Sequence, residues 1–173
     1  KLQAQQVQTD WEVLLIDNAS TDETQNRAVE IWRKCPVTTL RIIPEPKIGL
    51  VHARKRVFQE ATYDKISFLD DDNWPAPQWV EHVQTIFESD PQIGILGGLN
   101  HVSLDSPAPS WFHPYLKRYQ EKFTNCFAVG PQAATEGDLS HTRGHVWGAG
   151  LSIRKQSWID LQRHHFPALC TGI

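Results

Sequence analysis

The chain has 173 residues, 40% of them hydrophobic, which is enough to build one compact domain with a sizeable core. Its formal net charge is −3, so it lacks the broad basic field that attracts nucleic acid, and we expect no nucleic-acid partner. No apolar run reaches the roughly 20 residues that a membrane-spanning helix needs, so we expect no membrane segment in residues 1–173.

The three cysteines, Cys35, Cys126 and Cys170, lie far apart and lack the C-x-x-C spacing of a zinc knuckle. Their odd number favours reduced thiols over a disulfide framework, and disulfides are rare in the cytosol. We therefore expect a cytoplasmic location, which includes the cytoplasmic face of a membrane.

The first hundred residues alternate short apolar runs with amphipathic stretches. The run at 12–16 predicts a strand buried on both faces, and Ser20–Glu23 has capping-box spacing, which predicts a helix that ends before Pro36. Further strands are predicted at 40–43, 65–69 and 93–96, with helices after Gly49 and after Pro77. This alternation predicts an α/β, Rossmann-like fold with a mostly parallel sheet and helices on both faces.

The regular pattern stops at about residue 103 and returns near residue 145. Residues 103–143 are rich in Pro, Ser, Gly and aromatics, and loops of this length usually carry a function. Residues 145–153 are predicted to form a strand at the rim of the sheet, followed by a short helix at 156–162. We therefore expect a single domain over 1–173, with a variable loop region at 103–143.

Acidic residues follow two of the predicted strands. Asp17 comes directly after the first strand, and Asp70, Asp71 and Asp72 come after the third. Ligands of open parallel sheets bind outside the carboxyl ends of the strands. Adjacent carboxylates repel one another unless they share a cation, and Mg²⁺ or Mn²⁺ takes carboxylate oxygens and bridges to diphosphate. The pattern favours a metal-diphosphate site, but a solvated turn that caps the next helix accounts for Asp-Asp-Asp-Asn equally well.

Several segments, read in chain order, resemble the family 2 glycosyltransferases of the GT-A fold. The segment LLIDNASTDET is similar to the family's strand-end signature, KIGLVHARKRVFQEA to its helix start, and SFLDDDNWPAPQWV to its metal motif of the D-x-D type. Two later segments, ILGGLN and WGAGLSIRKQSW, are similar to its G-G strand and its G-A-G segment. The resemblance runs from residue 12 to residue 158.

The resemblance implies a role for each matching residue. Asp17 would contact the nucleotide base, and Arg54 would lie near the nucleotide. Asp70 and Asp71 would meet the ribose or the sugar, and Asp72, together with Asp70, would hold a Mg²⁺ or Mn²⁺ ion. Small residues let backbone approach a ligand closely, and the three that would border the sugar and acceptor pocket are Gly148, Ala149 and Gly150.

The chain also departs from the family pattern. Ile48 stands where the family commonly has Asn before Gly49. Lys1–Thr9 is interpreted as the helix that follows the family's first strand, and no G-E-D-like carboxylate is found before Ile173. We therefore expect a domain truncated at both ends and inactive as it stands, with its catalytic base beyond Ile173.

Together these observations predict a metal-dependent glycosyltransferase of glycan or polysaccharide biosynthesis. It would transfer a sugar from a nucleotide diphosphate sugar, which we expect to be a UDP-sugar, to an acceptor hydroxyl; inversion follows from the resemblance alone. Two alternatives remain: a nucleotidyltransferase or phosphotransferase with a metal at the strand ends, and a nucleotide-sugar-binding module without turnover.

Overall fold

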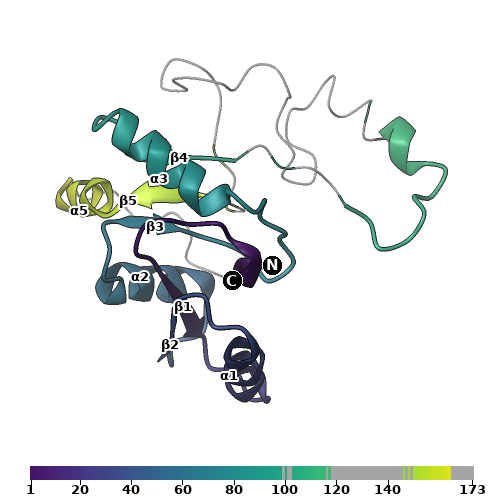
Figure 1. The fold of residues 1–173 in the computed structure, drawn as a ribbon, viewed down its shortest axis with the longest axis horizontal. Helices are drawn as coiled ribbons and strands as arrows, with labels where there is room; N and C mark the ends of the chain where they lie inside the picture. Colours follow the sequence, from purple (N-terminus) through teal and green to yellow (C-terminus); the bar gives the residue numbers. More distant parts are fainter. Residues whose placement is uncertain are drawn as a thin grey trace. The chain divides into compact units, whose positions relative to one another are not determined.

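Strands and helices alternate along the chain (Figure 1). The computed structural model describes residues 1–98, 100, 103–115, 117, 146, 148 and 150–164. In chain order the elements are the 3₁₀ turn η1 (Leu2–Ala4), β1 (Glu12–Asp17), α1 (Thr24–Lys34), β2 (Thr39–Pro44), α2 (Leu50–Glu60), β3 (Lys65–Ser67), α3 (Trp79–Ser89), β4 (Ile95–Leu96), β5 (Ser152–Arg154) and α5 (Lys155–Arg163). The predicted α/β alternation is therefore confirmed.

The strands that the structure describes form two sheets. β1 and β2 are parallel, with Glu12 opposite Thr39 and Asp17 opposite Pro44. The other sheet has the order β3-β5-β4. The Lys155 N–H donates to Asp64 O at 2.6 Å and the Phe68 N–H to Leu151 O at 2.7 Å, so residue numbers rise along one strand as they fall along the other. This is antiparallel pairing.

The expected mostly parallel sheet is therefore not confirmed, since only β1 and β2 form a defined parallel pair among the described strands. α1 connects the end of β1 to the start of β2, and a helical crossover of this kind lets the second strand run in the same direction as the first. β5 follows β4 only after some 55 residues, most of which lie outside the described part of the chain, so the order of the elements alone does not set its direction. The predicted strands at 65–69 and 93–96 are also shorter than expected, and the strand predicted at 145–153 is described only as β5, because residues 145, 147 and 149 lie outside the described residues.

The chain divides into two compact units. Unit 1 comprises residues 1–66, 74–95 and 153 onward, and unit 2 comprises residues 67–73 and 96–152. In unit 1, α2 contacts β1 and α1 contacts β2. Phe58 on α2 stacks on Trp158 of α5 with ring centroids 4.3 Å apart, and the Arg154 guanidinium lies over the Phe87 ring.

Helix α1 begins later than its sequence predicts. The Asp22 carboxylate accepts from the Thr24 N–H at 3.0 Å and from the Thr24 hydroxyl, and the Glu23 carboxylate accepts from Asn26. The capping box at Ser20–Glu23 is therefore wrong, because the Ser20 N–H donates to Asp17 instead and the turn at Asp22 starts the helix.

The first nine residues do not form the predicted helix. Only η1 is helical, and the glutamines around it bind the ends of two other helices. Gln3 Nε2 donates to Ile31 O and Cys35 O at the end of α1, while Gln5 Oε1 accepts from the Val80 N–H at the start of α3. Helix ends leave backbone groups unpaired, and these side chains satisfy some of them.

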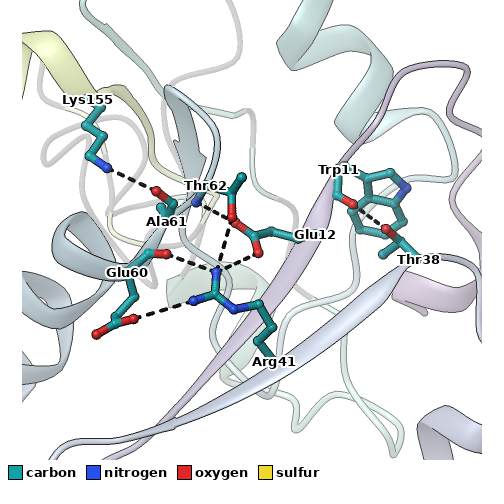
Figure 2. Close-up of polar contacts among 8 residues, drawn as sticks. All are labelled: Trp11, Glu12, Thr38, Arg41, Glu60, Ala61, Thr62 and Lys155. Carbon is teal, nitrogen blue, oxygen red and sulfur yellow. Dashed lines mark hydrogen bonds and ion pairs between the residues drawn. The ribbon is translucent and has the colours of Figure 1, made fainter.

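A polar network centred on Arg41 joins β1, β2 and the end of α2 (Figure 2). Arg41 Nη1 lies 2.9 Å from Glu12 Oε2 and donates to Glu60 O at 3.0 Å, and Nη2 lies 3.4 Å from the Glu60 carboxylate. The Thr62 N–H donates to the other oxygen of Glu12 at 2.6 Å, and Lys155 Nζ donates to Ala61 O. Cations thus satisfy carbonyls at the negative end of α2.

No helix in the described part of the chain combines the length and the apolar character that a bilayer crossing requires.

Candidate functional site

The carboxylate of Asp17 is held at the carboxyl end of β1. Asp17 is only 6% exposed. Its Oδ2 accepts from Gln25 Nε2 at 2.5 Å, and its Oδ1 accepts from the Ser20 N–H at 3.3 Å. Hydrogen bonds from Ser20 and Gln25 hold the pKa of Asp17 below its ordinary value, because they favour the charged form. Asp17 is therefore a positioned anion.

Asn18 links the ends of the two parallel strands. Its Nδ2 donates to Glu45 O at 3.0 Å and to Lys47 O at 2.6 Å, and its Oδ1 accepts from the Gly49 N–H at 2.7 Å. The Glu45 N–H in turn donates to Asp17 O at 2.9 Å. This side chain therefore fixes the loop after β2 against the loop after β1. Asn18 was not among the residues predicted from sequence, although an Asn placed directly after a strand is a signal for a side chain that bonds to turn backbone.

Gly49 starts α2 with a backbone that other residues adopt only under strain, since its φ is 128°. The helix begins at Leu50, which confirms the predicted start. Arg54, assigned to the nucleotide by resemblance, lies in the second turn of α2, within the same unit as Asp17.

In unit 2, residues Asp70–Asn73 form a turn just beyond β3. The Asn73 N–H donates to Asp70 O at 3.1 Å, and Asn73 Nδ2 donates to Asp72 Oδ1 at 3.0 Å. Asp70, Asp71 and Asp72 are all exposed. The solvated turn of the alternative interpretation is therefore present, but its capping role is wrong, because α3 begins only at Trp79.

The glycine segment pairs with the strand that leads into this turn. The Gly150 N–H donates to Phe68 O at 3.1 Å, which places Gly150 beside a residue only two positions before Asp70. Gly150 has a φ of 74°, a conformation that glycine adopts without strain. A Cβ at Gly97 would lie 2.6 Å from Val146 Cγ1, so the G-G segment also packs closely here. Gly148 is described, whereas Ala149 lies outside the described residues.

The predicted site residues thus fall into two groups. Asp17 and Arg54 belong to unit 1, and Asp70–Asp72 and Gly148–Gly150 belong to unit 2. No three His, Cys, Asp or Glu side chains converge on one point within the described residues. Mg²⁺ is often bound through only one or two carboxylates together with substrate phosphates, so an aspartate run open to solvent still fits a metal that arrives with a diphosphate.

A comparison with protein families identifies the chain. Residues 2–148 match the family model described as glycosyl transferase family 2. The chain belongs to this family. It is therefore a glycosyltransferase domain of the α/β GT-A fold, and its partners are a nucleotide-sugar donor and an acceptor. No match was found among curated proteins.

Most of the predicted site residues lie inside the range that matches the family model. The matched range includes β1 with Asp17, the start of α2 with Arg54, the whole Asp70–Asn73 turn and Gly148. Gly150 lies two residues beyond the match, but its N–H donates to Phe68 O, just after β3 and inside the matched range.

Proposed function

We propose that this glycosyltransferase uses a UDP-sugar, binds its diphosphate through Mg²⁺ or Mn²⁺, and transfers the sugar to an acceptor hydroxyl with inversion, in glycan or polysaccharide biosynthesis. The observation that carries the proposal is the solvent-accessible run of Asp70, Asp71 and Asp72. None of the three forms an ion pair with a cationic side chain in the part of the chain that the structure describes. Three adjacent carboxylates without a counter-charge favour binding of a cation.

In this proposal the residues of unit 2 handle the diphosphate and the sugar. Asp72, with Asp70, would hold the metal, and Asp71 would meet the ribose or the sugar. A bound divalent ion would stabilise negative charge on the departing diphosphate. Backbone around Gly148, Ala149 and Gly150 would border the sugar and acceptor pocket, where small side chains or none allow close approach.

The residues of unit 1 would hold the nucleoside. Asp17 is buried, anionic and fixed at the end of β1, which suits recognition of hydrogen-bond donors on a base. Arg54 would lie near the nucleotide, and its charge suits a phosphate. Asn18 would keep the two loops that surround this region in place.

Calorimetric titration with UDP, with and without Mn²⁺, tests the metal step, and a donor screen with product analysis tests the reaction. We expect UDP to bind more weakly after chelation of the metal, and the product to carry the sugar without diphosphate. A product in which the sugar keeps its diphosphate would instead support a nucleotidyltransferase or phosphotransferase. Binding of the donor without any product in the full-length protein would support a binding module.

A further inference from the structure

Ile48, in the loop between β2 and α2, is the most exposed large hydrophobic residue that the structure describes. It is 82% exposed, against 65% for Trp74, the next in order. Single exposed apolar side chains are common on protein surfaces, so exposure alone assigns Ile48 no role. Ile48 differs from such residues in how its backbone is held.

One side chain binds the backbone on both sides of Ile48. Asn18 Nδ2 donates to Lys47 O at 2.6 Å, in the peptide group that joins Lys47 to Ile48. Asn18 Oδ1 accepts from the Gly49 N–H at 2.7 Å, in the peptide group that joins Ile48 to Gly49. Ile48 therefore presents an apolar side chain from a fixed backbone, and a backbone that is already ordered loses little entropy when a ligand binds.

The loop that carries Ile48 is also bound to the end of β1. Asn18 follows Asp17 directly, and the Glu45 N–H donates to Asp17 O at 2.9 Å. Asp17 offers a buried carboxylate, and Ile48 offers an exposed apolar surface. A nucleobase has hydrogen-bonding groups along its edge and an apolar face on each side of its ring, so it can use both kinds of contact.

We propose that Ile48 covers one face of the uracil ring whose edge meets Asp17. The inference rests on the proposed function, because it adds a contact to the nucleoside that the same site would hold. Ile48 stands where the family commonly has Asn, so the contact belongs to this chain and is not one that family membership supplies. Burial of apolar surface on the ring lets the nucleoside, and not only the diphosphate, contribute to affinity.

The test measures the binding of UDP and of inorganic diphosphate, both with Mn²⁺, to the full-length protein by calorimetric titration. Removing a CH₂ group from an apolar contact weakens binding by roughly 4-fold. Ile48→Ala removes the side chain beyond Cβ, of which a planar ring covers only a part. We therefore expect UDP to bind about 5- to 10-fold more weakly and diphosphate to bind as before. The heat-capacity change of UDP binding should also become less negative, because less apolar surface is buried.

Two further variants, Ile48→Val and Ile48→Thr, separate the polarity of the side chain from its shape. Valine and threonine have almost the same shape, but the threonine hydroxyl is costly to bury against an apolar surface. We expect Ile48→Thr to bind UDP several-fold more weakly than Ile48→Val. Equal UDP affinities in these two variants would mean that Ile48 makes no apolar contact with the base, and would overturn the inference.

The matched control is Ile31→Ala, which shortens another exposed isoleucine of unit 1, on α1. This variant should bind UDP and diphosphate as the unchanged protein does. The Ile48 variants should keep the unfolding midpoint of the unchanged protein, since Ile48 is exposed and the contacts of Asn18 are to backbone groups that no substitution at this position removes.

Unchanged UDP binding in Ile48→Ala, or equal losses for UDP and diphosphate, would overturn the role of Ile48 and leave the proposed function intact. Unchanged UDP binding with a raised KM for the acceptor would place the apolar contact on the acceptor, and unchanged UDP binding with weaker self-association would place it on a second copy of the chain. Both results also overturn the inference. Failure of the unchanged full-length protein to bind any uridine nucleotide with Mn²⁺ would overturn the proposed function together with the inference.

Discussion

The network around Arg41 and the turn at Asp70–Asn73 both gather several charged groups, but they balance those charges in opposite ways. In the network, Arg41 lies between the carboxylates of Glu12 and Glu60, and backbone groups fill the remaining hydrogen-bonding positions. In the turn, three aspartates are open to solvent, and their hydrogen bonds within the described residues are to Asn73 or to the turn backbone. One region balances its charges internally, and the other carries a negative charge that no cationic side chain among the described residues balances.

This difference separates residues that hold the fold from residues that we propose bind a ligand. Breaking a balanced, partly buried pair leaves a charge without its partner, which costs stability. Removing one exposed carboxylate from an acidic run costs the fold little and relieves repulsion. The network should therefore respond to mutation in unfolding experiments, and the turn should respond in binding experiments.

The largest expected effect is on binding, in Asp72→Ala. If Asp72 holds the metal, its loss should weaken Mn²⁺-dependent UDP binding by at least about 100-fold, since even the loss of residues that only support metal ligands costs roughly 10- to 100-fold. The circular dichroism spectrum and the unfolding midpoint should stay unchanged. Asp105→Ala, which removes another exposed aspartate of unit 2, is the control and should bind UDP normally. Unchanged affinity in Asp72→Ala would remove the metal assignment.

The next effect is on stability, in Arg41→Met. The Arg41 and Glu12 side chains are 33% and 10% exposed, so the substitution leaves the Glu12 carboxylate largely buried without its cation. We expect the free energy of unfolding to fall by about 2 kcal/mol, less than for a fully buried pair. Urea denaturation measures it, and Lys34→Met, which breaks the exposed Lys34–Glu30 pair, should change stability by at most about 0.5 kcal/mol. Similar losses of unfolding free energy in Arg41→Met and Lys34→Met would contradict the view that the Arg41 network holds the fold.

The sequence predicted the parts of this fold that depend on local pattern. The apolar run at β1, the glycine before α2 and the acidic run after β3 each carry their structural signal within a few neighbouring residues. The sequence did not predict the antiparallel pairing of β5, because a strand far along the chain can pair in either direction. The hydrogen bonds of Gln3, Gln5 and Gln25 were not predicted either. Each joins the glutamine to a different part of the chain, and the residues next to the glutamine carry no signal for that partner.

A smaller effect on both stability and binding is expected at Asn18. Its carboxamide donates two hydrogen bonds and accepts one, and it lies at the proposed ligand-binding end of β1. Asn18→Ala removes three hydrogen bonds that hold the loop before Gly49. We expect a loss of about 1–2 kcal/mol in unfolding free energy and a several-fold loss in UDP affinity. Asn18→Asp keeps the acceptor for the Gly49 N–H but places a carboxylate against two carbonyl oxygens, so it should be no better than alanine. Unchanged stability and UDP affinity in Asn18→Asp would show that the two donor bonds are unimportant.

The smallest expected effect is the response of the Arg41 network to pH. Burial raises the pKa of Glu12, but hydrogen bonds from Thr62 and Arg41 and the charge of Arg41 outweigh it, so the net effect is a pKa below the ordinary value of 4.5. A carboxyl whose pKa is lowered by folding stabilises the native state when the pH is above its unfolded value. That contribution is lost as the pH falls through 4.5 and then through the folded value. Asp17 and Asp22 also have lowered pKa values, so acid alone does not isolate Glu12.

The isolating measurement is the difference in unfolding free energy between the unchanged protein and Glu12→Gln, followed by urea denaturation from about pH 6 to about pH 3. Glutamine cannot ionise, so the unchanged protein should have its largest advantage at the upper end of this range and lose it toward the lower end. In the Arg41→Met background the same difference should depend less on pH, because the cation that favours the charged form of Glu12 is gone. A difference that grows as the pH falls would mean that the native state raises the pKa of Glu12. In that case the network would not balance its charges internally, and the contrast with the Asp70–Asn73 turn would fail.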